Sequence, residues 1–84
     1  MDEHQYDDVL NEIKLLSKKV DGVIDIEKCY ARKIGMKYFI DLHLTVNANI
    51  TVREGHSIAH KLKDRIKNEM PEIADVLIHI EPNE

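Results

Sequence analysis

Apolar residues recur every three or four positions in two stretches of the chain, the spacing of an amphipathic helix. The first stretch runs from Tyr6 to Lys19, and Asp21-Gly22 favours a turn after it. The second begins at Thr51-Val52-Arg53-Glu54, which has the form of a capping box, and ends before Pro71. The predicted buried positions are Tyr6, Val9, Leu10, Ile13, Leu16 and Val20 in the first helix, and Ile58, Ala59, Leu62, Ile66 and Met70 in the second.

Three other stretches have the residue pattern of strands. Val23 to Lys33 predicts one strand, and Ile34-Gly35 supplies a hairpin turn after it. The next segment alternates and predicts a strand with a buried side and a polar side. The buried side has Met36, Tyr38, Ile40, Leu42, Leu44 and Val46, and the polar side has Lys37, Phe39, Asp41, His43, Thr45 and Asn47. The last strand, Ala74 to Glu81, turns Val76, Ile78 and Ile80 inward and Leu77, His79 and Glu81 outward, and Pro82 ends it. The order α-β-β-α-β predicts an α+β fold with two helices on one face of a three-stranded sheet.

Length and charge narrow the class of protein. The 84 residues allow one domain, 1–84, in which residues 1–5 are expected to fray. A net charge of −4 argues against a nucleic-acid partner. A single cysteine, Cys29, forms no intrachain disulfide and indicates a reducing compartment. No apolar run approaches the roughly 20 residues of a membrane span, so we expect no membrane insertion of this segment.

Two histidines lie on the polar sides of the predicted strands, and each has a carboxylate two residues away. The pairs are Asp41 with His43 and His79 with Glu81. If the two strands are neighbours, the imidazoles converge, and imidazole with carboxylate suits zinc. The carboxylates would then be ligands, or partners that fix the histidine tautomers. Alternatively, all four are solvated groups on an open sheet face. Spacing alone favours that second interpretation, because such pairs are common by chance.

The remaining candidates are weaker. His56 and His60 lie four residues apart on the second helix, a spacing that allows chelation, but the glutamate of an H-E-x-x-H hydrolase is absent. We expect His60 to be exposed. For His56, both a metal-ligand role and a solvated surface position remain open. Cys29 is expected to be a small buried hydrophobic residue. The chain has no nucleophile elbow, phosphate-binding glycine loop or C-x-x-C motif, so the sequence does not indicate an enzyme.

Five segments together resemble the C-terminal cytoplasmic domain of the cation diffusion facilitators, a family of divalent-metal efflux transporters. They are Val20–Val23, Ala31–Gly35, Phe39–Leu44, Glu54–Ala59 and Val76–Pro82. The resemblance spans about three quarters of the chain. It implies a ferredoxin-like (metallochaperone-like) two-layer sandwich that forms a homodimer in the cytoplasm, attached to a transmembrane transport domain if the protein is longer.

The resemblance also implies a metal site near the subunit interface. Its ligands would be His43, His56, His79 and Glu81, with Glu27 standing where the family has a further histidine. Asp41 and Arg32 are expected to support the ligands or to lie at the interface. Zn²⁺ is the expected ion, with Mn²⁺ or Fe²⁺ as alternatives. Bound metal would close the dimer and tune transport. A metal-independent dimerisation module and a regulatory domain for a small molecule are the competing interpretations.

Overall fold

The computed structural model describes residues 3–83, with side chains from residue 7 onward. Its elements are α1 (Glu3–Ser17), β1 (Asp25–Ile34), β2 (Lys37–Val46), α2 (Val52–Glu69) and β3 (Ile73–Pro82). The predicted order of elements is therefore confirmed. The first helix begins at Glu3, before the predicted Tyr6. Of residues 1–5, which were expected to fray, residues 1 and 2 lie outside the described part of the chain.

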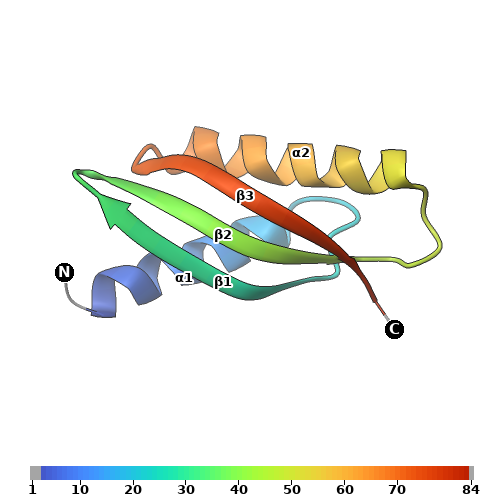
Figure 1. Cartoon of the computed structure of the whole chain (residues 1–84), viewed down its shortest axis with the longest axis horizontal. Coiled ribbons are helices and arrows are strands. Elements are labelled where there is room, and N and C mark those ends of the chain that lie inside the picture. Colours follow the sequence, from blue (N-terminus) through green and yellow to red (C-terminus); the bar gives the residue numbers. More distant parts are fainter. Residues whose placement is uncertain (1–2, 84) are drawn as a thin grey trace.

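The sheet has the order β1-β2-β3, so the strand with the clearest alternation lies at its centre. β1 and β2 form an antiparallel hairpin, whereas β2 and β3 run parallel. A parallel pair needs a crossover connection, and α2 supplies it. Figure 1 shows both helices on the same side of the sheet, with α2 running alongside β3. The opposite face, which we call the open face, carries no helix of residues 3–83.

One hydrophobic core fills the space between the helices and the sheet. The fully buried side chains come from both layers, and the largest are Ile13, Leu42, Leu44, Leu62, Ile66, Met70 and Val76. At α2, Thr51 accepts a hydrogen bond from the Glu54 amide, and Glu54 accepts one from the Thr51 amide. The predicted capping box is thus confirmed. No described helix is long and apolar enough to cross a membrane.

Two residues predicted to be buried are exposed. Met36 is 84% exposed because it lies in the hairpin turn, before β2 begins. Ile80 is 41% exposed and faces Gly55 in the first turns of α2. Because glycine has no side chain to cover it, this end of β3 stays partly open to solvent. Those two predictions were wrong at the margins of the core.

β1 contains a bulge, which explains its unclear sequence pattern. Glu27 pairs with His43, but Tyr30 pairs with Asp41, so β1 carries one extra residue there. Lys28 takes a left-handed conformation with φ of 47°. The bulge leaves Cys29 packed against the core, where burial raises the pKa of its thiol to about 11. The thiol therefore stays protonated at neutral pH, in agreement with its predicted hydrophobic role.

Candidate metal site

The pairing of β2 with β3 brings the two strand histidines together on the open face. His43 stands directly opposite His79 in the parallel register. Their rings are stacked, with centroids 4.7 Å apart and planes inclined by 26°. The condition that the sequence left open, that these two strands are neighbours, is met. The imidazoles converge as predicted.

Each histidine is paired with a carboxylate of the other strand. His43 Nδ1 forms a hydrogen bond with Glu81 Oε1, and His79 Nε2 lies 3.2 Å from Asp41 Oδ1. Asp41 lies two residues before His43 on β2, and Glu81 lies two residues after His79 on β3. Each carboxylate therefore reaches diagonally to the histidine of the other strand. The crossed pairs therefore tie β2 to β3 through side chains as well as backbone.

The electrostatics favour an ionised Glu81. The hydrogen bond from His43 is the main cause that lowers the pKa of this carboxyl below its usual value of 4.5. The charges of His43, Lys28 and His79 act in the same direction. A carboxylate that accepts from Nδ1 fixes the histidine tautomer and leaves Nε2 with the lone pair that a metal requires. The contact with Glu81 therefore holds the His43 ring in a fixed orientation on the open face.

Three residues of this region have the compactness of a metal site. One potential ligand atom each of Asp41, His43 and His79 lies within 4.8 Å of the other two. Among the described residues, this is the group of three or more histidine, cysteine or acidic side chains that meets that condition. Two imidazole nitrogens and a carboxylate oxygen form a three-ligand set of the kind that Zn²⁺ accepts.

Glu27 and Arg32 lie on β1, outside this compact group. Glu27 is opposite His43, and with Glu81 it lines an open hollow of about 560 Å³. Its side chain is exposed, on the strand next to the compact group. Arg32 lies further along β1, opposite Phe39, and lines a different hollow of about 320 Å³ beside Asp41.

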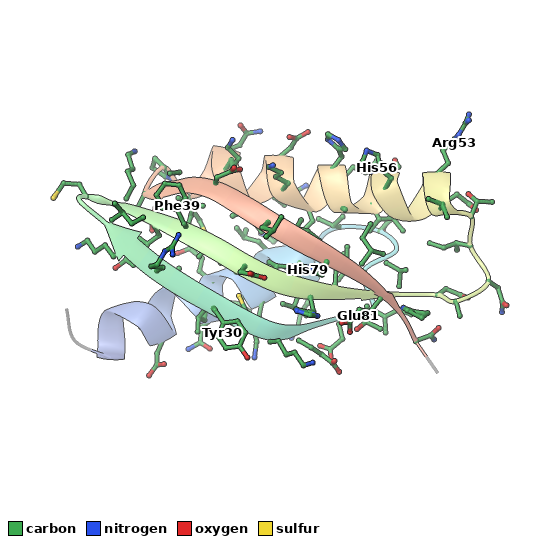
Figure 2. All side chains as sticks on the ribbon, in the orientation of Figure 1. Tyr30, Phe39, Arg53, His56, His79 and Glu81 are labelled. Atoms are coloured by element: carbon green, nitrogen blue, oxygen red, sulfur yellow. The ribbon has the colours of Figure 1, made fainter. Side chains whose placement is uncertain are left out.

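His56 is not brought to the open face within the chain. It is an exposed residue of α2, the helix that packs on the other face of the sheet. Figure 2 shows His79 and Glu81 on the strands and His56 apart from them on the helix. The ring of His56 instead contacts that of His60, with centroids 4.7 Å apart. The structure therefore divides the ligand set that the resemblance implied.

Asp41 belongs to the compact group, although the family resemblance implied a supporting or interface role for it. The D-x-H spacing on β2 was visible, but it places Asp41 beside its own His43. Its contact with His79 depends on the β2–β3 register, which one strand alone does not reveal. The charge of Lys28 near Glu81 was missed because it follows from the bulge in β1.

The fold and the site together define a ferredoxin-like two-layer domain with a histidine and carboxylate cluster suited to a divalent cation. The family described as "Cation efflux protein, cytoplasmic domain" matches residues 5–83. The chain belongs to this family. This match confirms the family resemblance and the cytoplasmic location expected from the sequence. The family is one of transporters rather than of enzymes.

Individual relatives agree with this assignment. The chain is similar to the cation-efflux pump FieF of Shewanella oneidensis, with 32% identity over 98% of this chain and 27% of the relative. It is also 29% identical to the manganese efflux system protein MneP of Bacillus subtilis, over 89% of this chain and 25% of the relative. The chain thus spans about a quarter of the length of these relatives.

Solved structures confirm the fold. One variant of the MamM CTD superposes with a TM-score of 0.89 at 23% identity, covering 93% of this chain and 98% of the other. A second variant gives a TM-score of 0.92 at 22% identity, covering 99% and 100%. These similarities establish the two-layer α-β-β-α-β architecture.

Proposed function

We propose that this cytoplasmic domain senses a divalent cation and regulates a cation efflux transporter through a change in its homodimer. The observation that carries the proposal is the compact group of Asp41, His43 and His79 on the open face. In this proposal the three side chains are the ligands. Glu81 accepts a hydrogen bond from His43 and orients its ring, so the two carboxylates exchange the roles that the family resemblance implied for them.

The donor set supports Zn²⁺ as the first candidate ion. Two imidazoles and one carboxylate match the nitrogen and oxygen ligands of zinc and leave a fourth position open. Two of the relatives in Bacillus subtilis are named as manganese efflux systems, so Mn²⁺ is also a candidate. Mn²⁺ prefers more oxygen ligands, which Glu81 and Glu27 can supply from the same face. Fe²⁺ lies between these two cases.

The charge of the open face supports a metal-driven closure of the dimer. Asp41, Glu81 and Glu27 place carboxylates around the two histidines. If the open faces of two copies approach each other, these acids repel until a cation neutralises them. A cation that binds more tightly to the closed dimer shifts the population toward it, and the attached transport domain responds.

Calorimetric titration of the metal-free chain tests the site. We expect Zn²⁺ to bind at pH 7.5, and the double variant His43→Gln, His79→Gln to lose the strongest binding. Asp41→Asn should weaken binding more than Glu81→Gln, because the first removes a ligand and the second removes an orienting partner. Asp8→Asn on α1 is a control for the loss of one exposed acid, and it should bind like the unmodified chain.

Two outcomes would contradict the proposal. Unchanged Zn²⁺ and Mn²⁺ binding in the double variant would show that the metal does not bind at the open face. No binding by the unmodified chain, with a dimer present in sedimentation, would favour the metal-independent dimerisation module. Because imidazole binds metals only when deprotonated, binding should also weaken at pH 5.5.

A further inference from the structure

The turn between β1 and β2 carries exposed side chains that the proposed metal site does not use. Ile34 is 53% exposed and Met36 is 84% exposed, on either side of Gly35. Every residue from 32 to 37 is exposed, and we call this segment the hairpin tip. Its basic members are Arg32, Lys33 and Lys37. The hairpin tip therefore combines uncovered apolar side chains with cations.

The fold leaves the apolar side chains of the hairpin tip without cover. Neither Ile34 nor Met36 belongs to the core or to the side chains packed against it. A Cβ added at Gly35, between them, would meet no heavy atom within 4 Å, so the turn stands in open space. Turns normally carry small polar residues, and exposed apolar side chains favour contact with another surface. A surface outside residues 7–83 is needed to cover them.

The basic charge of the hairpin tip is not neutralised within the described chain. The whole chain has a net charge of −4, whereas the hairpin tip contains no acid. Among residues 7–83, no ion pair engages Arg32 or Lys33, and the ammonium of Lys33 lies 5.7 Å from the ring centroid of Tyr38. Lys37 donates a hydrogen bond to the carbonyl oxygen of Pro71 at 2.8 Å, which leaves its charge in place.

Acidic side chains beside the hairpin tip already have partners. Asp41 and Asp75 line a hollow together with Arg32. Asp41 pairs with His79 and Asp75 pairs with Lys63, each at 3.2 Å. The guanidinium of Arg32 is thus available to an anion outside the described chain.

The position of the hairpin tip places it at one end of the molecule. Figure 1 shows the turn between β1 and β2 at the same end as the beginning of α1, and the connection from β2 to α2 at the other end. A transport domain attached before α1 would therefore lie at the end of the hairpin tip. The acids of α1 at this end, Asp7 and Asp8, belong to the other layer. The family domain is cytoplasmic, and the cytoplasmic leaflet of a membrane carries anionic lipids.

We infer that the hairpin tip docks on an anionic membrane surface. Met36 and Ile34 insert between the lipid headgroups, and Arg32 and Lys33 pair with lipid phosphates. An attached transport domain holds the hairpin tip near the bilayer, so its effective concentration makes a weak contact sufficient. The inference rests on membership of the family and not on the proposed metal site.

Partitioning of the metal-free chain onto vesicles, in the presence of a chelator, tests the contact. We expect the chain to bind vesicles of equal phosphatidylglycerol and phosphatidylcholine at low ionic strength, and not vesicles of phosphatidylcholine alone. Arg32→Gln should lower the partition coefficient about fivefold, the contribution of one cation near an anionic surface. Arg53→Gln is the matched control, because Arg53 is an exposed arginine at the other end of the molecule (Figure 2), and it should bind like the unmodified chain.

A single tryptophan locates the contact, because the chain contains none. On the anionic vesicles, Met36→Trp should show a blue-shifted emission and reduced quenching by acrylamide. Val52→Trp is the control, at a residue that is 91% exposed at the start of α2. It should show neither change.

Three results would overturn the inference. Equal weakening by Arg32→Gln and Arg53→Gln would show a general effect of charge. A blue shift with Val52→Trp but not with Met36→Trp would place the contact at the other end of the molecule. No partitioning onto the anionic vesicles would leave a protein segment as the partner of the hairpin tip. None of these results bears on metal binding at the open face, because the chelator removes the metal.

Discussion

At the scale of single residues, the contact between His43 and Glu81 makes the stability of the folded chain depend on pH. The contact lowers the pKa of Glu81, so the folded chain holds this carboxylate ionised to a lower pH than the unfolded chain does. A group whose pKa is lower in the folded state contributes stability above its unfolded pKa, here near 4.5. That contribution is lost as the pH falls through the folded value.

We therefore predict that His43→Gln raises the pKa of Glu81 in the metal-free chain. The removal of the principal hydrogen bond should move the titration toward 4.5, as followed by the NMR signal of the side-chain carboxyl carbon. Glu54 is an internal control, since hydrogen bonding to Thr51 lowers the pKa of its carboxyl. A parallel shift of Glu54 would indicate a general unfolding effect, and an unmoved Glu81 would contradict the assigned cause.

Gly22, in the turn after α1, is the other residue with a sharp structural requirement. Its φ of 95° lies in the left-handed region, and an added Cβ would come within 2.4 Å of Ile58 Cδ1. Gly35 also has a positive φ, of 62°, but a Cβ there would meet no atom within 4 Å. The two glycines share the backbone requirement but differ in steric room.

We predict that Gly22→Ala lowers the free energy of unfolding by about 2 kcal/mol or more, and Gly35→Ala by about 1 kcal/mol. The excess combines the contact with Ile58 and the larger φ of Gly22, and urea unfolding gives both values. The additional variant Ile58→Ala, which shortens the opposing side chain, should reduce the penalty of Gly22→Ala. Equal losses at the two glycines would show that the packing against α2 does not matter.

At the scale of the element, the bulge in β1 determines which β1 side chains join the open face. Before the bulge Ile26 is buried and Glu27 is opposite His43, whereas after it Tyr30 is opposite Asp41. The extra residue reverses the alternation along the strand. The left-handed Lys28 provides this reversal, at a conformational cost that a residue other than glycine normally bears.

We predict that Lys28→Gly leaves the stability unchanged or raises it by up to about 1 kcal/mol, because glycine adopts positive φ without strain. Arg32→Gly is the control on the same strand, at an exposed position with ordinary β geometry. It should destabilise the chain by roughly 0.5–1 kcal/mol. A greater loss at Lys28 than at Arg32, measured by urea unfolding, would mean that the charge of Lys28 outweighs its backbone strain.

At the scale of the whole molecule, the two layers give the chain two unlike surfaces. The open face carries the proposed site and exposed apolar side chains, with Tyr30 63% and Leu77 59% exposed. Figure 2 shows Tyr30 on β1 and Phe39 on β2, the strands that border this region. Apolar side chains beside the cluster support the proposal that the open face meets a second copy, because exposed apolar patches commonly mark protein contacts.

We predict that Leu77→Asp weakens the proposed homodimer. Burial of a new charge at the interface opposes association, so the midpoint of dissociation in sedimentation should move to at least about tenfold higher concentration. Leu15→Asp is the matched control, since Leu15 on α1 is 62% exposed but lies in the other layer. Zn²⁺ should also reduce the radius of gyration of the unmodified dimer in X-ray scattering. Equal effects of the two substitutions would contradict a dimer through the open face.

The sequence by itself determined the elements, their order and the two-layer arrangement. These features follow from local periodicity and local capping, such as the alternation of β2 and the Thr51–Glu54 capping box, and each is readable within a few residues. It also identified His43 and His79 as outward-facing residues. The predictions that Met36 and Ile80 are buried were wrong, because each lies near the end of an element, where the neighbouring element no longer covers its side chain.

The tertiary structure alone decided which side chains meet. The contact of His43 with His79 and the crossed contacts with Glu81 and Asp41 depend on the register of two strands that α2 separates in sequence. That register is set by packing of the whole core, and a shift of β3 by one residue would turn His79 toward the helices and away from His43. The separation of His56 from this cluster follows from the same cause, because the layer in which a helix packs is a property of the complete fold.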